Sequence, residues 1–355
     1  MSELSMNRRR FLGAAAGAAA GAGILGGLRL EAARAGVLVP PGKRSIIIYT
    51  VRDRIGAAPD DTGVPYGFAQ VLERLAEIGY HGIEFAGYTQ SEAILGRQIT
   101  PAEIRAILDA NGLIAIGSHG GIPSTITPAT LAAFDAYMEQ ALTIGQQYIG
   151  TGGDPTGSSY KADWDAAAEV WNTLGERAAA NGLKLYTHNH DTAYGFLLDS
   201  GPLDASGRPT RSSGIRRLEY FLQVSDPRYV HLEMDIYWAH VAQHRFQTYT
   251  APDGSSQTNV FDPGGLVAAN TMRYPLFHAK DGLKTGEPPE VGSGYTMVPL
   301  GTGDIDFQVF FDNMGAKGFH YPMYEQDNAP GGAADPGRSL RFSEESYNNM
   351  AALRG

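Results

Sequence analysis

The sequence predicts an α/β protein with the (β/α)8 barrel architecture, and three observations support this fold class. From residue 44 onward, short apolar runs rich in β-branched residues alternate with stretches of helical periodicity, and eight such cycles are present. The predicted strand starts recur at intervals of about 31 to 46 residues, which is the size of one βα unit. Polar residues end nearly every predicted strand, and no Gly-x-Gly-x-x-Gly turn follows the first one. We therefore prefer a closed barrel to the alternative, an open doubly wound sheet.

The first two cycles contain clear strand and helix signals. Residues 45–49 form an apolar run typical of a fully buried strand, and apolar positions between residues 68 and 78 predict a helix that ends at Gly79. The second strand is predicted at residues 82–86. Its helix starts at Thr100-Pro101-Ala102-Glu103, where a capping Thr precedes Pro at the first helical position and Glu at the third.

The next three strands are predicted at residues 113–119, at residues 148–150 and from residue 184 onward. A second Thr-Pro start at Thr127 opens a helix whose apolar residues are Leu131, Phe134, Met138, Ala141 and Leu142. The helix before the fifth strand presents one apolar face, which consists of Trp164, Ala168, Trp171 and Leu174.

The last three strands are predicted at residues 230–235, 275–278 and 319–325. A helix that carries Phe307, Phe310, Phe311 and Met314 precedes the eighth strand. Three long excursions follow strands, and we expect them to lie over the barrel mouth as lids or substrate walls: residues 192–213, 243–264 and 282–303.

Composition excludes several classes of partner and site. The chain of 355 residues has a formal net charge of −10 and only six lysines, and no stripe of basic residues occurs after the first ten positions. A nucleic-acid partner held by phosphate neutralisation is therefore not expected. Cysteine is absent, which excludes disulfides, thiolate metal sites and a cysteine nucleophile.

Residues 1–35 resemble a twin-arginine export signal, which would leave residues 36–355 as one barrel domain. The motif Arg8-Arg9-Arg10-Phe11-Leu12 precedes a run rich in Gly and Ala, and residues 33–35 offer a small-x-small cleavage site. The alternative is a membrane anchor, but Ala and Gly bury little apolar area. Cleavage would leave 23 basic and 36 acidic residues, so we expect an acidic periplasmic or secreted protein that engages the export machinery.

Ionisable residues stand at the carboxyl ends of six predicted strands, where a barrel places its active site. Each one alone is explained by a loop cap or a structural ion pair. Burying them together costs several kcal/mol per group unless a cation or a substrate compensates. A divalent cation such as Mn²⁺, Mg²⁺, Co²⁺, Fe²⁺ or Zn²⁺ suits imidazole and carboxylate ligands without sulfur. These strand-end residues are Glu84, His119, His188, His190, Glu233, Asp235, His278, Lys280, Glu325 and Asp327.

The two histidines of the fifth strand are predicted to have different roles. Side chains two apart in a strand share a face, so His188 and His190 point the same way and Asn189 points away. A strand rises about 3.3 Å per residue, so the two imidazoles stand roughly 6 to 7 Å apart along it. We therefore expect one of them to bind the metal and the other to face the substrate.

Four motifs resemble those of the sugar phosphate isomerase/epimerase family, whose fold is the xylose isomerase-like barrel. They come in the family's order over residues 44–350: Thr187-His188-Asn189-His190-Asp191, Leu232-Glu233-Met234-Asp235-Ile236-Tyr237-Trp238, Phe277-His278-Ala279-Lys280-Asp281-Gly282 and Tyr324-Glu325-Gln326-Asp327. The resemblance implies a divalent metal bound by one residue from each of strands five to eight, which gives His188, Asp235, His278 and Glu325. The strand-five ligand is often Glu in this family, and the reverse assignment of His188 and His190 stays open.

The resemblance further implies an isomerase or epimerase that removes a proton next to a sugar carbonyl. Loss of a β-leaving group after the same proton abstraction would make the protein a lyase or dehydratase on a keto-sugar or 3-keto-glycoside. Export and acidity favour a non-phosphorylated sugar, ketosugar or cyclitol over a sugar phosphate. The expected proton carriers are His119, His190, Glu233 and Lys280. The expected substrate-binding residues are Glu84, Trp238 and Asp327.

Two other classes of function fit parts of the sequence. A hydrolase like the metal-dependent endonucleases that share this barrel would need a basic face for DNA, which is not visible. A secreted sugar-binding protein would keep the barrel and its site without turnover. The full set of ligands and bases argues against this second class.

Overall fold

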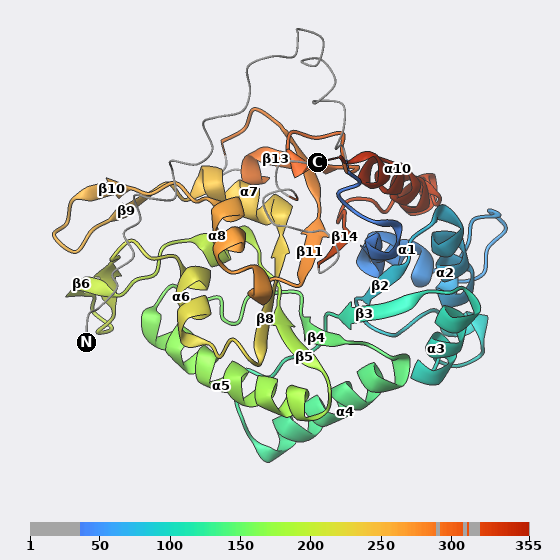
Figure 1. The fold of residues 1–355 in the computed structure, drawn as a ribbon, viewed down its shortest axis with the longest axis horizontal. Helices are drawn as coiled ribbons and strands as arrows, with labels where there is room; N and C mark the ends of the chain where they lie inside the picture. The colour runs from blue at the N-terminus through green and yellow to red at the C-terminus, as the bar shows by residue number, and fades with distance from the viewer. Residues whose placement is uncertain (1–35, 289–291, 308–310, 312–319, 355) are drawn as a thin grey trace, which may run out of the picture. The chain divides into compact units, whose positions relative to one another are not determined.

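The structure is a computed structural model that describes residues 36–288, 292–307, 311 and 320–354. The predicted export signal, residues 1–35, lies outside the described residues. Eight strands form one sheet with the order β3-β2-β1-β14-β11-β8-β5-β4, and the pairs are parallel, which confirms the predicted fold class (Figure 1). The strands are β1 Ser45–Ile47, β2 Gly82–Phe85, β3 Ile114–Ser118, β4 Tyr148–Thr151, β5 Lys184–Thr187, β8 Val230–Asp235, β11 Leu276–Ala279 and β14 Tyr321–Tyr324.

The barrel closes at a narrow seam between β3 and β4. The two strands meet at an isolated parallel bridge between His119 and Gly150, and the N–H of Gly120 donates to the carbonyl of Gly150 over 2.8 Å. One more hydrogen bond, from Gln147 N to Ile116 O (3.1 Å), joins the lower part of the seam. The barrel is therefore nearly closed, and its weakest lateral contact runs beside His119.

The helix signals in the first half of the sequence are confirmed. Helix α2 (Gly67–Ile78) is followed by Gly79, whose φ of 115° is a left-handed conformation that glycine adopts without strain. Thr100 and Glu103 form the predicted capping box of α3 (Pro101–Ala110), and Thr127 forms another with Thr130 at the start of α4 (Pro128–Ile144). Leu142 is an exception, because its side chain is 45% exposed on the outer face of α4.

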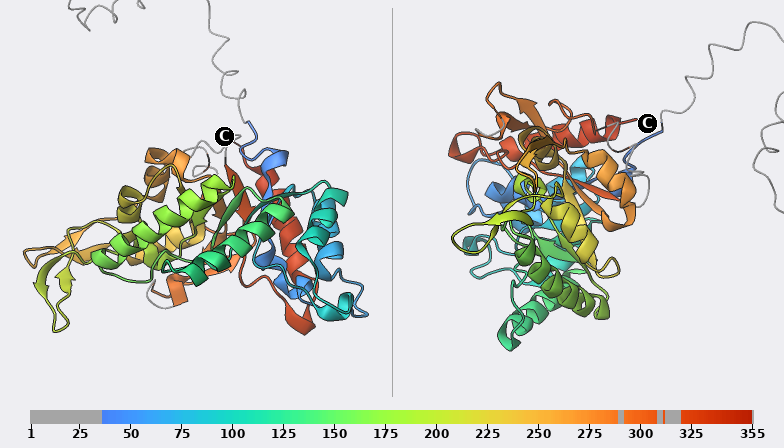
Figure 2. Two further views of the ribbon diagram at one scale, coloured as in Figure 1. Left: turned by 90° about the horizontal axis from the view of Figure 1, so that it is seen from below. Right: turned by 90° about the vertical axis from the view of Figure 1, so that its left-hand side faces the viewer.

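Helices surround the strands on the outside, as Figures 1 and 2 show. The predicted apolar face of α5 is buried. The predicted helix around Phe307 and Phe311 reaches positions outside the described residues, which include Phe310 and Met314. The helices are α1 Arg52–Ile55, α2 Gly67–Ile78, α3 Pro101–Ala110, α4 Pro128–Ile144, α5 Lys161–Ala180, α6 Arg217–Val224, α7 Ile236–Arg245, α8 Pro263–Ala269 and α10 Arg338–Ala352. Short 3-10 helices are η2 Pro41–Lys43, η3 Ile48–Val51, η4 Glu92–Ile94, η5 Asp191–Tyr194, η6 Thr271–Arg273, η7 Gly292–Gly294 and η8 Gly332–Ala334.

Only one of the three predicted excursions lies at the barrel mouth. The first contains the hairpin of β6 Ser200–Leu203 and β7 Pro209–Arg211, and the second contains that of β9 Thr248–Thr250 and β10 Ser256–Thr258. These two hairpins extend sideways beyond the helices (Figure 2, left), because their backbones bond to each other and to the start of α5 rather than to strand ends. The prediction that these hairpins cover the mouth is therefore wrong, although Arg245, near the start of the second excursion, lines a cavity beside it.

The third excursion forms a wall beside the mouth, made by the hairpin of β12 Asp281–Lys284 and β13 Tyr295–Val298. The buried carboxylate of Asp281 anchors it. This carboxylate accepts hydrogen bonds from the backbone N–H groups of Gly282 (2.8 Å), Gly301 (2.8 Å), Gly303 (3.0 Å) and Ile305 (3.4 Å). The path of the wall is thus fixed through main-chain groups.

The barrel interior below the site is a packed core. Five buried side chains from β3, β4, β5, β11 and β14 fill it: Ile116, Tyr148, Tyr186, Leu276 and Met323. The Tyr186 hydroxyl donates upward to Glu84, so this core ends directly beneath the ionisable groups. A second, larger apolar cluster lies between strands and helices. Among the described residues, no helix is long and apolar enough to cross a membrane.

Candidate active site

The parallel strands bring their ionisable carboxyl ends together in one mouth. The register pairs His278 of β11 with Asp235 of β8, and β14 continues directly into Glu325. His188 immediately follows β5, and His119 immediately follows β3. Because parallel strands end at the same edge, residues far apart in sequence become neighbours.

The lower part of the site is organised by Glu233, which is fully buried. One of its oxygens, Oε2, lies 2.9 Å from His119 Nε2, 3.1 Å from His188 Nδ1 and 3.2 Å from His278 Nε2. Glu84, also fully buried, places its Oε2 2.8 Å from His278 Nε2. These two carboxylates therefore hold three imidazoles from below.

The upper part of the site brings together the four predicted ligands, His188, Asp235, His278 and Glu325. Each offers a nitrogen or oxygen atom, and these four atoms all lie within 4.8 Å of one another. All four residues are buried, with Asp235 and His278 at 0% exposure. A rival group of His119, His188, Glu233 and His278 meets the same distance limit, so His188 and His278 belong to both groups.

The charge state of the cluster follows from burial and from its carboxylates. Burial lowers the pKa of His188 to about 4, so its imidazole is neutral near pH 7. Burial also opposes the charged form of His278, but Glu233 and Glu325 outweigh it and hold the pKa of His278 well above its usual value. For Asp235, burial is outweighed by Lys280, and the pKa falls.

Lys280 connects the cluster to the cavity. Its Nζ lies 2.8 Å from Glu325 Oε2, 2.9 Å from Asp327 Oδ1 and 3.2 Å from Asp235 Oδ2. Burial acts to lower the pKa of Lys280, yet Asp235 and Glu325 raise it above its ordinary value. The amine is therefore a fixed positive charge at the cavity floor.

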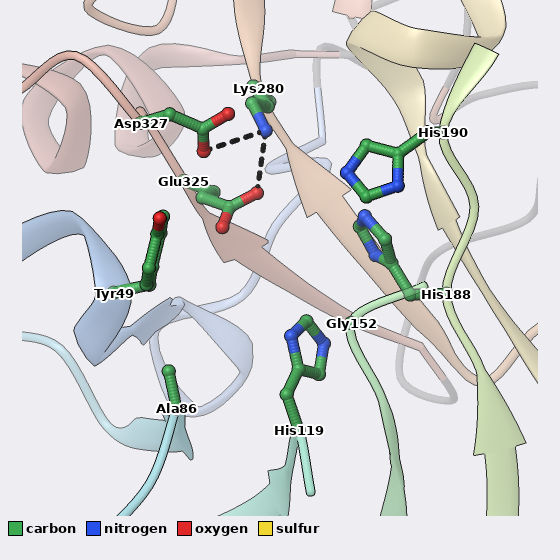
Figure 3. A pocket seen from close by; sticks show the side chains of 9 residues that line it. All are labelled: Tyr49, Ala86, His119, Gly152, His188, His190, Lys280, Glu325 and Asp327. Carbon is green, nitrogen blue, oxygen red and sulfur yellow. Dashed lines mark hydrogen bonds and ion pairs between the residues drawn. The ribbon is translucent and has the colours of Figure 1, made fainter. Parts of the chain in front are cut away.

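A cavity of about 390 Å³ opens above the cluster. Figure 3 shows that its walls come from different strand ends, with the two histidines that follow β5 opposite Tyr49. The imidazole of His190 stands edge-on to that of His188, with ring centroids 5.2 Å apart. The lining residues are Tyr49, Ala86, His119, Gly152, His188, His190, Lys280, Glu325 and Asp327.

His188 and His190 both line the cavity but differ in their other neighbours. His188 belongs to both metal-competent groups, whereas His190 belongs to neither of those found among the described residues and lines the cavity. His119, Lys280 and Asp327 also line the cavity. The assignment of His188 as ligand stays a prediction, and this arrangement favours it.

Three other predicted residues lie elsewhere than expected. Glu84, predicted to bind substrate, is fully buried beneath His278, and Glu233, predicted to carry a proton, is fully buried beneath three imidazoles. Their side chains therefore orient the histidines and do not line the cavity. Trp238 lines an adjoining cavity, because Asp235 caps α7 by accepting from Trp238 N (2.9 Å) and so turns the chain away from the strand.

Sequence reasoning missed residues whose role depends on loop paths. Tyr49 was predicted inside a buried strand, but β1 ends at Ile47 and the Tyr49 ring is 39% exposed at the mouth. Asn189 points away from the cavity, as predicted, and its Oδ1 accepts from Asp235 N (3.1 Å), which positions a predicted ligand. At Gly152, an added Cβ would lie 2.7 Å from His119 Nδ1, so glycine leaves room for that imidazole. Of these residues, only Gly152 could have been singled out from the sequence, because a glycine is typical of places where another group approaches the backbone closely.

Comparison with known proteins gives the same fold. A crystal structure of a sugar phosphate isomerase/epimerase from Parabacteroides distasonis is 21% identical, with a TM-score of 0.62 over 88% of this chain and 94% of that one. A second such protein from the same organism is 18% identical, with a TM-score of 0.59 over 86% and 96% of the chains. A probable 3-DHS dehydratase from Bacillus anthracis is 13% identical, with a TM-score of 0.55 over 88% and 98%.

At these identities the similar structures establish the fold alone. No curated protein matches the sequence. The family model described as "Xylose isomerase-like TIM barrel" matches residues 72–342, which is most of the chain and includes the strand ends that form the site. On the strength of this match and of the barrel itself, the chain belongs to the xylose isomerase-like TIM barrel family.

Proposed function

We propose that the protein is a divalent-metal-dependent isomerase or epimerase that acts on a non-phosphorylated sugar, ketosugar or cyclitol. The observation that carries this proposal is the convergence of His188, Asp235, His278 and Glu325 within 4.8 Å beneath an open cavity. The family match and the isomerase/epimerase neighbours support an enzyme of this general kind.

The residues present fit a divalent cation. Two imidazoles and two carboxylates from four neighbouring strands give a set of nitrogen and oxygen ligands without sulfur. Asp235 Oδ2 is buried and accepts no hydrogen bond in the structure, although Lys280 Nζ lies 3.2 Å away. A buried acceptor with a free lone pair is what a cation would satisfy.

The cation would be held by His188, Asp235, His278 and Glu325, and Mn²⁺, Mg²⁺, Co²⁺, Fe²⁺ and Zn²⁺ all suit this set. When bound, it supplies Lewis acidity that polarises a carbonyl and stabilises the charge that develops as the adjacent C–H proton leaves. The side chains that line the cavity would bind the substrate, orient it and move its proton.

Among the proposed proton carriers, His190 is the best placed to act as a base. It lines the cavity, and its ring is outside the cluster of carboxylates that hold the other imidazoles. His119 also lines the cavity, but Glu84 and Glu233 outweigh burial and raise its pKa, which suits a proton donor. Lys280 keeps its proton for the same electrostatic reason and would donate a hydrogen bond to a substrate oxygen.

The proposed substrate carries no phosphate. The cavity floor combines one ammonium group with the carboxylates of Glu325 and Asp327, so it offers hydrogen bonds to hydroxyls without a net positive field. Tyr49 presents an exposed ring at the mouth, which suits packing against the C–H face of a sugar. A lyase or dehydratase acting on a keto-sugar or 3-keto-glycoside is the second candidate, and the dehydratase neighbour favours it.

The proposal is tested by NMR in D₂O with metal-loaded protein and a panel of free sugars, ketosugars and 3-keto-glycosides. We expect deuterium to enter one C–H position of a substrate, and a chelator to stop this exchange. Metal analysis of the same sample should give about one divalent cation per chain. A new alkene signal or a released group would identify the lyase instead. Sugar binding without any exchange or turnover would contradict the proposal and indicate a sugar-binding barrel.

We also propose that the protein is exported in folded form to the periplasm or beyond. The double variant Arg8→Lys/Arg9→Lys should leave the full-length precursor in the cytoplasm, because the twin-arginine motif requires both guanidinium groups. Cell fractionation and the mass of the product measure this. Arg29→Lys, which lies outside the motif, is the matched control and should be processed normally. Normal processing of the double variant would show that residues 1–35 are not a twin-arginine signal.

A further inference from the structure

A second cavity of about 570 Å³ adjoins the candidate active site. Asp327 lines both cavities, and Asp191, which follows His190 in the chain, lines the second. The indole of Trp238 stands between them, with its ring 5.5 Å from that of His190 and 5.5 Å from Lys280 Nζ. Both volumes fall in the range of about 300–1,000 Å³ that is typical of ligand pockets. A ligand that extends past Trp238 would therefore occupy both.

The second cavity has the surface chemistry of a site for a neutral sugar ring. Trp238 and Tyr295 supply aromatic surface, and such rings pack against the apolar C–H faces of sugars. Arg245 and Asp191 form an ion pair of 2.5 Å in its wall, so the two charges compensate while their remaining donor and acceptor positions stay available to hydroxyls. Proton abstraction from a single ring over the metal-competent cluster uses none of these groups.

The wall of this cavity is held in place before any ligand binds. The Tyr237 hydroxyl lies 2.9 Å from Ser293 Oγ, and Asn328 Nδ2 donates to the carbonyl of Met297 over 3.0 Å. Together with the anchoring of the excursion by Asp281, these contacts join α7, η7, β13 and the segment after β14. A wall fixed in this way reduces the ordering cost of binding.

We propose that the substrate has two rings, like a disaccharide or a compound of similar size, and that its reacting ring carries the carbonyl that the proposed function requires. The reacting ring lies over the metal-competent cluster, and the second ring lies in the cavity bounded by Trp238, Tyr295 and Arg245. This inference rests on the proposed function, since it names the size class of the substrate for that same site. A single free monosaccharide would leave the second cavity to water.

The test measures binding by calorimetry, so it does not depend on turnover. Methyl α-glucoside is compared with maltose, and methyl β-glucoside with cellobiose, on the metal-loaded protein. We expect at least one disaccharide to bind about 10-fold or more tightly than its methyl glycoside, because only the disaccharide fills both cavities. Thr296→Trp places an indole in the second cavity from the exposed face of β13 and should remove this advantage without weakening the methyl glycoside. Thr258→Trp makes the same change on β10, away from both cavities, and should alter neither.

The outcomes separate this inference from the proposed function. If methyl glycosides bind and disaccharides bind no more tightly, or if Thr296→Trp keeps the disaccharide advantage, the two-ring substrate is wrong while the sugar site stands. If no sugar of either size binds and none of the D₂O panel exchanges, the proposed function is wrong and the inference is overturned with it.

Discussion

Asparagine in place of Asp235 is expected to abolish stoichiometric binding of a divalent cation while leaving the barrel folded. Asp235 is fully buried, and one of its oxygens, Oδ2, lies 3.8 Å from a ring nitrogen of His188 and 3.8 Å from one of His278. Its other oxygen, Oδ1, caps α7 by accepting from Trp238 N, a role that an Asn side chain keeps. Loss of a residue that merely orients a ligand costs 10–100-fold in metal affinity, so loss of a ligand should cost more than about 100-fold. The rate of turnover should fall as the bound metal is lost.

Metal analysis after dialysis, with thermal unfolding of the same samples, measures this effect. Glu325→Gln removes a ligand from a different strand and should give the same loss. Asp262→Asn is the matched control, because Asp262 caps α8 in the same way (2.9 Å to Gly265 N) but is exposed and far from the cluster. Full occupancy in both Asp235→Asn and Glu325→Gln would overturn the ligand assignment.

The second large effect separates a ligand from a proton carrier at the end of β5. His188→Ala should lower metal affinity strongly, because His188 belongs to both metal-competent groups. His190→Gln should keep the metal and lower kcat by about 10²–10⁴-fold, the usual range for loss of a general acid or base. The structure supports this division, since the His190 ring lies on the cavity wall beside that of His188.

Metal titration of both variants, followed by kinetics at saturating metal, distinguishes the two roles. His81→Gln serves as the control, because His81 precedes β2 at the opposite end of the barrel. Metal loss in His190→Gln with normal binding in His188→Ala would reverse the assignment. Unchanged metal and turnover in both variants would mean that this strand end is only structural.

The barrel was predictable from sequence because its signals are local. Each strand is a short apolar run, and caps such as Thr100 with Glu103 mark helix starts through contacts within one turn. The paths of the first two excursions were not predictable. Their hairpins are placed by backbone hydrogen bonds such as Ser212 N to Thr250 O (3.0 Å), and backbone groups are the same at every position.

The sequence predicts which residues gather at the candidate site, but it does not predict which of them lie beneath the imidazoles and which line the cavity. Glu84, Glu233 and Glu325 are all carboxylates near the ends of strands, and only the three-dimensional arrangement shows which lie beneath the imidazoles and which reaches the cavity. The register between β2 and β3 shifts between Ile83 and Glu84, and sequence periodicity gives no sign of such an irregularity. Trp238 illustrates the same limit, because its direction depends on the helix that Asp235 starts.

Because Asp281 anchors the third excursion, the side chains of that segment can change while its backbone keeps its course. The Asp281 carboxylate holds that segment through peptide N–H groups, so the side chains on β13 can be replaced without losing the anchor. Mutations at positions such as Thr296 and Met297 then change the shape and polarity of the second cavity while the backbone keeps its course. The cluster under the first cavity is constrained by mutual contacts among six or more ionisable groups and has no such freedom. If the second cavity binds part of the substrate as proposed, single substitutions at this wall change which substrates fit, while the groups at the strand ends stay as they are.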